Sequence, residues 1–266
     1  MIVDGKKIAA SIYESVASEV EKMDIKPVLA AITCAPNFET KRYLELKKRK
    51  AAEVGITLRV VELPETATTE EVVACVRVVA GEVDGVVVQL PFPLHIDREK
   101  VLAAVPVDKD PDGFAYAENP NACLPPVVGA IKEIAEHYDF TFKGKQVVVL
   151  GQGRLVGSPA VRFLHSVGAS VSVSTEHDST QAEQLRSADV IISGIGEPHF
   201  ITADKIKPGV VVFDAGTSED GGLMVGDVHP DVAEGASLVT PVPGGIGPIT
   251  VALLLRNLVS LRCQDK

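Results

Sequence analysis

The sequence has only four cysteines, and they lie far apart along the chain, without the short spacings that bind a metal. A zinc site or a small disulfide framework is therefore not expected, and buried, reduced thiols are the simpler interpretation. The four residues are Cys34, Cys75, Cys123 and Cys263.

Positive charge and long apolar runs are also scarce. The chain carries 26 Lys and Arg against 36 Asp and Glu, a formal net charge of −10, whereas a nucleic-acid surface needs a basic face. No apolar run reaches membrane-spanning length, and the opening residues MIVDGKKIAA match neither a signal peptide nor a transit peptide. We therefore expect a cytoplasmic protein with no nucleic-acid or membrane partner.

Two series of alternating helix and strand patterns fill the chain. Its 266 residues, 46% of them hydrophobic, suffice for one large domain or two ordinary ones. In the first series, Gly55 ends one helical pattern, and a capping box of Thr68 and Glu71 begins another. The alternation predicts a parallel sheet covered on both faces. In chain order, its elements are a helix around residues 8–20, a strand at 27–33, a helix at 39–54, a strand at 56–63, a helix after 68 and a strand at 84–93.

A second series follows a proline-rich stretch at residues 118–130. A helix is predicted at 158–167, and three of the four strands around it end in glycine. We expect a second α/β unit of the dinucleotide-binding type, with a boundary near residue 123. The predicted strands are residues 145–153, 169–175, 188–196 and 209–216.

The glycines of GQGRLVGSP follow the first strand of this second unit. Gly151, Gly153 and Gly157 would let backbone N–H groups and a helix N-terminus approach a pyrophosphate with no side chain in the way. The spacing is one residue longer than the usual fingerprint, so a plain strand-to-helix turn is the alternative. The other predicted cofactor contacts are Arg154, Leu155 and Val156 within the loop, and the strand-end glycines Gly194 and Gly216.

An acidic residue closes the next strand, in STEHD. Glu176 is placed to accept hydrogen bonds from an adenosine ribose and to repel a 2′-phosphate, with Asp178 as the alternative if the strand ends later. Arg154 could instead receive a phosphate. The pattern favours NAD over NADP.

The helix predicted at residues 39–54 carries Tyr43 and Lys47, which are four residues apart and share a face. A solvated lysine is the ordinary interpretation, but burial or nearby cations could make it an acid or base near neutral pH. Gln89 ends a strand at the edge where ligands of open α/β sheets bind, although it could simply cap the strand. Asp112, in DKDPDGF, is typical of a turn.

Taken together, these stretches resemble one family, the bifunctional methylenetetrahydrofolate dehydrogenase/cyclohydrolases. The resemblance runs from VDGKKIA to GPITVALLLRN, and its most specific mark is TPVPGGIGPIT at residues 240–250. It implies two α/β domains with a cleft between them and a homodimer formed through the nucleotide domain. The implied domains are residues 1–123 with 244–266 for folate and catalysis, and 124–243 as a Rossmann-type dinucleotide-binding domain. The other marks are TKRYLELKKRKAAEVGI, GVVVQLPFP, DKDPDGF, GQGRLVGSP and ADVIISGIGEP.

The resemblance also implies roles for individual residues. Lys47 would be the catalytic lysine, Gln89 the amide that contacts and tunes it, and Tyr43 the ring that stacks on the folate. Asp112 would bind the amino edge of the pterin through a charge-assisted hydrogen bond. The folate pocket would be lined with bare, stiff backbone by Pro243, Gly244 and Gly245.

Three stretches depart from the family pattern: CLPPVVG, CAPNFET and DAGTSE. The last, at residues 214–219, could alter the nicotinamide side of the site. Gln152 and Glu176 stand where many NADP-using members carry small or basic residues, which favours NAD again.

The predicted function is therefore a pair of linked reactions. The first is NAD(P)-dependent oxidation of 5,10-methylenetetrahydrofolate to 5,10-methenyltetrahydrofolate, and the second is hydrolysis to 10-formyltetrahydrofolate, with Lys47 managing protons. Three alternatives stay open: a cyclohydrolase that has lost the dehydrogenase step, an amino-acid or shikimate-type dehydrogenase, and a non-catalytic nucleotide- or folate-binding module.

Overall fold

The computed structural model describes residues 1–119, 121–175 and 178–264, and its contacts divide the chain into two compact units. The five-stranded unit contains Met1–Ala9 and Pro126–Thr250, and the three-stranded unit contains Ala10–Pro125 and Val251–Lys266. The division falls inside the first and last helices, α1 (Gly5–Glu21) and α9 (Ile246–Gln264). The predicted functional division at residues 123 and 243 stays a prediction.

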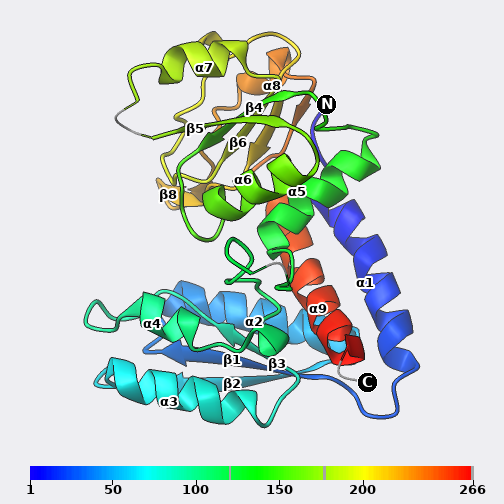
Figure 1. Cartoon of the computed structure of the whole chain (residues 1–266), viewed down its shortest axis with the longest axis vertical. Helices are drawn as coiled ribbons and strands as arrows, with labels where there is room; N and C mark the ends of the chain where they lie inside the picture. Colours follow the sequence, from blue (N-terminus) through cyan, green and yellow to red (C-terminus); the bar gives the residue numbers. More distant parts are fainter. Residues whose placement is uncertain (120, 176–177, 265–266) are drawn as a thin grey trace. The chain divides into compact units, whose positions relative to one another are not determined.

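The three-stranded unit is built on a parallel sheet in the order β2-β1-β3 (Figure 1). One of its cores joins Ile32 of β1 and Val88 of β3 to Val76 of α3 and Val101 of α4. Because β1 and β3 are buried along almost their whole length, they are nearly continuous apolar runs in the sequence. The elements are β1 (Val28–Cys34), α2 (Phe38–Glu53), β2 (Thr57–Leu63), α3 (Thr69–Ala80), β3 (Gly85–Val88), α4 (Arg98–Ala103) and the short turn η1 (Val107–Lys109).

The boundary signals in this unit act as predicted. The Thr68 side chain accepts a hydrogen bond from the Glu71 amide, and the Glu71 carboxylate accepts from the Thr68 amide, so the capping box is confirmed. Gly55 follows α2 with a φ of 77°, the left-handed conformation in which glycine commonly ends a helix. The short helix α4 has no counterpart among the predicted elements.

The five-stranded unit has a parallel sheet in the order β10-β7-β6-β4-β5, which confirms the predicted α/β fold of two units. The chain runs outward in both directions from β4, so the carboxyl ends of β4 and β6 meet at a topological switch point. Helix α5 and the β8–β9 hairpin were not predicted. The elements are α5 (Pro126–His137), β4 (Gln146–Leu150), α6 (Gly157–Ser166), β5 (Ser170–Ser174), α7 (Gln181–Ser187), β6 (Val190–Ser193), η2 (Ala203–Lys205), β7 (Val211–Asp214), β8 (Ser218–Asp220), β9 (Leu223–Val225), α8 (Val232–Gly235) and β10 (Leu238–Val239).

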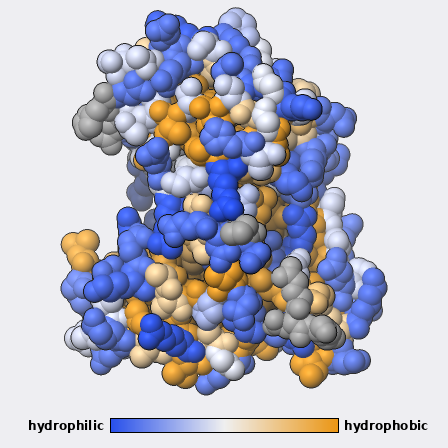
Figure 2. Space-filling view, viewed as in Figure 1, coloured by the Kyte–Doolittle hydropathy of each residue, from blue (hydrophilic) through white to orange (hydrophobic). Residues whose placement is uncertain are grey.

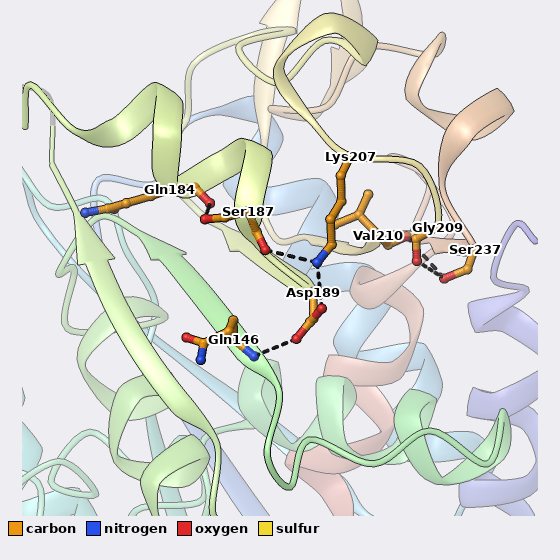
Figure 3. A network of polar contacts seen from close by, with 8 residues as sticks. All are labelled: Gln146, Gln184, Ser187, Asp189, Lys207, Gly209, Val210 and Ser237. Atoms are coloured by element: carbon orange, nitrogen blue, oxygen red, sulfur yellow. Dashed lines mark hydrogen bonds and ion pairs between the residues drawn. The ribbon is translucent and has the colours of Figure 1, made fainter.

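An ion pair ties together the amino ends of two strands of this sheet (Figure 3). The Asp189 carboxylate, just before β6, accepts hydrogen bonds from the backbone N–H of Gln146 at 2.9 Å and from Lys207 Nζ at 2.7 Å. Lys207 Nζ also donates to the carbonyl of Ser187. These hydrogen bonds, with that from Lys207 first, lower the pKa of Asp189.

Helix α9 is apolar enough to need an explanation. Among the described residues it is the one helix that could cross a membrane by length and composition, so the expectation that no stretch reaches this length is wrong on those two measures. The core helix of a globular domain passes the same test, and 56% of the apolar window is buried inside the structure. Packing therefore accounts for its composition, with Leu254, Leu258 and Val259 at most 2% exposed.

Polar and charged side chains cover most of the face in Figure 2, and apolar residues are scattered among them. Of the exposed apolar side chains, Leu94 and Phe38 are the most accessible, at 106% and 75%. All four cysteines are free. Cys34 is buried as predicted, but Cys263 is exposed on the last turns of α9, so the expectation of buried thiols is wrong there.

Candidate functional site

Lys47 lies on the buried side of α2. The buried residues of this helix are Thr40, Leu44, Lys47 and Ala51, so the lysine fills a position in an otherwise uncharged stripe. It is 7% exposed, whereas Lys48 and Arg49 are exposed. Because a buried charge is costly unless it is paired, the partners of Lys47 identify a candidate site.

Gln89 and Tyr43 are two of these partners. Gln89 directly follows β3, and its Oε1 accepts a hydrogen bond from Lys47 Nζ at 3.0 Å. Gln89 Nε2 donates to the carbonyl of Leu90 at 2.9 Å, which turns the amide oxygen toward the lysine. The ring centroid of Tyr43 lies 4.6 Å from Lys47 Nζ, within the range of a cation–π interaction. The structure thus brings together three residues that the sequence singled out.

The DKDPDGF turn supplies the nearby negative charge. Burial raises the pKa of Asp112, and the positive charge of Lys47 lowers it. Asp110 is 1% exposed and accepts hydrogen bonds from the backbone N–H groups of Gly113 at 2.9 Å and Phe114 at 2.7 Å. Burial, and then the charge of Asp112, raise the pKa of Asp110 from 3.8 to about 7. Asp110 is not among the predicted site residues, although an aspartate just before the Pro-Asp-Gly turn is a signal for this side-chain-to-backbone bonding.

The glycine loop, residues 151–157, connects β4 to α6. Gly151 has a φ of 80°, and a β-carbon at Gly157 would overlap the carbonyl oxygen of Gly151 and lie 2.9 Å from its carbonyl carbon. Only glycine lets the first turn of α6 approach the strand this closely. A β-carbon at Gly153 would meet no atom within 4 Å, so that part of the loop is open. Arg154 is half-buried and Leu155 is 48% exposed.

The carboxyl ends of β6 and β7 lie beside this loop. Val156 contacts Gly194, where a β-carbon would lie 3.0 Å from the valine Cγ1. Asp227, which is fully buried, accepts hydrogen bonds from the Ser193 hydroxyl at 2.6 Å and the Ile195 backbone N–H at 3.0 Å. A β-carbon at Gly216 would overlap the same carboxylate. The structure therefore brings Val156 and Gly216 next to the loop around Gly194.

A second buried carboxylate, Asp214, supports the same edge. It accepts hydrogen bonds from the backbone N–H groups of Gly216, Asp227 and Val228 at 2.9–3.1 Å. Burial raises the pKa of Asp214 from 3.8 to about 6, against the lowering effect of these bonds. The Asp214–Asp227 pair is not among the predicted features, because the β8–β9 hairpin separates the two residues in the sequence and only the fold brings them together.

Glu176, the predicted ribose-binding residue, lies outside the described residues. Its alternative, Asp178, accepts hydrogen bonds from the amide and hydroxyl of Thr180 at 2.8 and 2.6 Å and from Gln184 Nε2 at 3.0 Å. These bonds, with those from Thr180 first, lower the pKa of Asp178. The Asp178 carboxylate is thus engaged at the start of α7.

The segment Pro243–Gly245 joins β10 to α9 and belongs to the five-stranded unit. Gly244 has a φ of 110°, and a β-carbon there would meet no atom within 4 Å. The Gly245 N–H donates to the carbonyl of Pro241 at 2.8 Å. Glycine is required at Gly244 by this backbone conformation.

Two family models match the chain. "Tetrahydrofolate dehydrogenase/cyclohydrolase, catalytic domain" matches residues 3–112, and "Tetrahydrofolate dehydrogenase/cyclohydrolase, NAD(P)-binding domain" matches residues 125–266. A relative from Mycoplasmopsis synoviae, "Bifunctional protein FolD", is 35% identical over 98% of this chain and 99% of its own length.

Solved structures of similar proteins span the whole chain. The bifunctional FolD methylenetetrahydrofolate dehydrogenase/cyclohydrolase of Campylobacter jejuni is 32% identical, with a TM-score of 0.94 over 100% of this chain and 99% of its own. The corresponding Trypanosoma brucei enzyme, complexed with NADP and an inhibitor, is 31% identical, with a TM-score of 0.91 over 100% of this chain and 98% of its own.

Proposed function

This chain belongs to the tetrahydrofolate dehydrogenase/cyclohydrolase family, and we propose that Lys47 handles the protons of its hydrolytic reaction. It is a bifunctional enzyme of one-carbon folate metabolism. It oxidises 5,10-methylenetetrahydrofolate to 5,10-methenyltetrahydrofolate with NAD(P), and it hydrolyses that product to 10-formyltetrahydrofolate. The predicted pair of reactions is thereby confirmed, and the roles of individual residues are proposals.

The proposal for hydrolysis is carried by the hydrogen bond between Lys47 Nζ and Gln89 Oε1 on the buried stripe of α2. The attacking water gives up a proton as it adds to the methenyl carbon, and the ring nitrogen that leaves takes one up. A lysine amine can carry a proton between these positions if it is held in place. Gln89 holds it, because its own amide is fixed by the carbonyl of Leu90.

Tyr43 and Asp112, which lie near Lys47, are proposed to bind the folate, together with a segment of the five-stranded unit. Tyr43 is 37% exposed and offers ring surface for stacking. Asp112 would receive the amino edge of the pterin through a charge-assisted hydrogen bond, with the positive charge of Lys47 favouring its ionised form. Pro243, Gly244 and Gly245 would contact the folate with backbone alone.

Replacing Lys47 with methionine tests this assignment. Lys47→Met keeps a long apolar stem but cannot carry a proton, so hydrolysis of methenyltetrahydrofolate should fall about 100- to 10,000-fold. NAD binding, measured by isothermal titration calorimetry, should persist. Lys48→Met is the matched control, since Lys48 is exposed on the same helix and should tolerate the change. Unchanged hydrolysis in Lys47→Met would remove this lysine from the mechanism.

The glycine loop fits a dinucleotide. Its backbone is bare at Gly151 and Gly153, and α6 begins at Gly157, so phosphate oxygens would lie at the positive end of this helix, where the Ser158 N–H already donates to the Gly153 carbonyl at 3.1 Å. We propose Arg154, Leu155, Val156, Gly194 and Gly216 as the remaining contacts. When bound, NAD(P) supplies the hydride acceptor. The protein would position it, with Asp227 and Asp214 fixing the loops at the ends of β6 and β7.

The preference for NAD over NADP is a further proposal. It rests on the presence of Glu176 and Gln152 in the sequence. It also rests on the hydrogen bonds that the Asp178 carboxylate accepts from Thr180 and Gln184, which leave Glu176 as the carboxylate proposed for the ribose. Dehydrogenase activity on methylenetetrahydrofolate should be higher with NAD than with NADP. Glu176→Ser should raise the activity with NADP, because it removes the repulsion of the 2′-phosphate. A strong preference of the wild type for NADP would refute the assignment.

The oligomeric state and the location of the enzyme are also proposals. We propose a homodimer formed through the dinucleotide-binding domain, and a cytoplasmic enzyme with no nucleic-acid or membrane partner, in keeping with the net charge of −10. Light scattering coupled to gel filtration would give the mass in solution, and a monomer at micromolar concentration would contradict the dimer.

A further inference from the structure

We infer that Gly5, in the opening stretch VDGKKIA, is a positioning residue that sets the shape of the Pro243–Gly245 segment. This assignment rests on the proposed function, in which that segment contacts the folate. All the residues involved belong to the five-stranded unit. Gly5 itself is assigned no contact with substrate or cofactor.

The first residues of the chain extend the five-stranded sheet. Ile2 forms a parallel bridge with Val239 of β10, the strand at one end of the sheet. The Val3 N–H donates to the carbonyl of Val239 at 3.0 Å, and the Val239 N–H donates to the carbonyl of Met1 at 2.9 Å. The Val3 side chain is 2% exposed and anchors this short strand. The N-terminal strand is therefore fixed before the chain reaches Gly5.

Gly5 then contacts the proposed folate-binding segment directly. Its N–H donates to the carbonyl of Gly244 at 3.0 Å. The next residue, Gly245, donates its own N–H to the carbonyl of Pro241 at 2.8 Å. The carbonyl and the N–H of a single peptide group, the one between Gly244 and Gly245, are thus both held, one by Gly5 and the other by Pro241 within the segment.

The space around Gly5 admits no side chain. A β-carbon there would overlap the carbonyl oxygen of Gly245 and lie 2.6 Å from the oxygen of Gly244 and 2.7 Å from the carbonyl carbon of Gly245. All three are backbone atoms, so none can rotate away. Around Gly244 the opposite holds, because a β-carbon would meet no atom within 4 Å. The segment is closed where Gly5 packs against it and has open space at Gly244.

The proposed dinucleotide contacts are held by other residues. Gly157 packs on Gly151, Val156 packs on Gly194, and Asp227 bonds the loop after β6. None of these contacts involves Gly5. A side chain at Gly5 should therefore disturb folate binding much more than NAD binding, although both depend on the same unit.

Steady-state kinetics of Gly5→Ala test this assignment. Because overpacking typically costs about 1–3 kcal/mol, the KM for the folate should rise about 5- to 100-fold in both reactions, with kcat changing less. The Kd for NAD should stay within about twofold of wild type, since the contacts of the glycine loop are unchanged; NAD binding also reports that the unit is folded. Gly235→Ala in α8 is the matched control, because a β-carbon there meets no atom within 4 Å, and its KM values should match wild type.

The outcomes separate this assignment from the proposed function. A Gly5→Ala enzyme that binds NAD and keeps the wild-type KM for folate overturns the role of Gly5 and leaves the role of Lys47 standing. Normal hydrolysis by Lys47→Met would overturn the proposed function of that lysine without changing the result for Gly5→Ala.

Hydrogen exchange on the wild type gives a second measurement that holds even if Gly5→Ala fails to fold. Tetrahydrofolate should slow amide exchange in peptides covering residues 2–9 and 238–248 together, because the Gly5 N–H is bonded to Gly244. NAD alone should protect neither to the same extent. Protection of residues 238–248 with no change in residues 2–9 would overturn the assignment.

Discussion

The two candidate sites of this chain differ in the atoms that form them: one is made of side chains and the other of backbone. The lysine site (Tyr43, Lys47, Gln89 and Asp112) consists of side chains, which meet because a charged residue occupies a buried position of α2. The glycine loop consists of backbone, and its geometry depends on the absence of side chains at Gly151 and Gly157. The first site carries charge at defined atoms, and the second offers N–H groups and space.

This difference determines how each site can be broken. A site made of side chains loses function when a group is removed or its charge is changed. A site made of backbone loses function when atoms are added, since no side chain is there to be removed. Both sites rest on buried carboxylates that bind backbone N–H groups: Asp110 in one, and Asp214 with Asp227 in the other.

Removing the partner of the lysine should have the largest effect. Gln89→Leu deletes the hydrogen bond to Lys47 Nζ, and hydrogen bonds to charged groups contribute about 1.5–3 kcal/mol, so hydrolysis should fall about 10- to 100-fold. Dehydrogenase activity at saturating folate should fall less. Methenyltetrahydrofolate hydrolysis, followed by absorbance, measures the change. Equal losses in both reactions would show that Gln89 shapes the folate site generally and does not act through the lysine.

The second-largest effect should come from adding one methyl group to the glycine loop. Gly157→Ala forces a β-carbon against the Gly151 carbonyl, and overpacking costs about 1–3 kcal/mol, so the Kd for NAD should rise about 5- to 100-fold. Isothermal titration of NAD would measure it, with Gly235→Ala as the control for a glycine in open space. Wild-type affinity in Gly157→Ala would show that the loop can relax, and the contrast between the two sites would be weaker than the structure implies.

The buried carboxylates should make stability depend on pH. Folding raises the pKa of Asp110 to about 7 and of Asp214 to about 6, so their stabilising contribution is full below pH 3.8 and is lost as the pH rises through these values. Between about pH 5.5 and 8, Asp110 alone should lower the free energy of unfolding by on the order of 2 kcal/mol. In Asp110→Asn the side chain stays uncharged, so the free energy of unfolding should fall less over that pH range.

Urea unfolding at several pH values measures this dependence. The absolute stability of Asp110→Asn can fall, because the amide replaces an acceptor of backbone hydrogen bonds, but its slope with pH should be shallower. If the free energy of unfolding had the same pH dependence in the variant and in the wild type, a group other than Asp110 would be the one that takes up a proton on folding. Asp214→Asn would be measured in the same way.

The smallest change should follow a substitution at the amino ends of the strands in the five-stranded sheet, the edge opposite to the glycine loop. Lys207→Met breaks the ion pair with Asp189 at the amino ends of the strands (Figure 3), and partly exposed pairs contribute about 0.5–1 kcal/mol. Thermal unfolding should show a small loss, and both activities should be unchanged. Lys132→Met, which breaks an exposed pair with Glu136, should have less effect. A loss of NAD affinity in Lys207→Met would link the two edges of the sheet.

Much of the fold follows from short-range patterns. The strand at Val28–Cys34, the capping box of Thr68 and Glu71, and the helix end at Gly55 are each fixed by residues within a few positions of one another. The helix α5 was missed because the stretch LPPVVGA, which leads into its first turn, looks like a proline-rich connection. The first helical residue is Pro126, a position that proline tolerates well because no N–H is needed there.

The sequence by itself determined the chemistry available to this enzyme: a lysine four residues from a tyrosine, a glycine loop after an apolar strand, and a stiff, bare segment before the last helix. Only the tertiary structure decided which of four adjacent basic residues is buried, and that Gln89, 42 positions further along, is the partner of Lys47. It also decided that Asp214 meets Asp227, and that Gly5 supports a segment near the other end of the chain. The physical reason is that local patterns depend on bonds between near neighbours, whereas burial and pairing depend on surfaces that exist only after distant segments have packed.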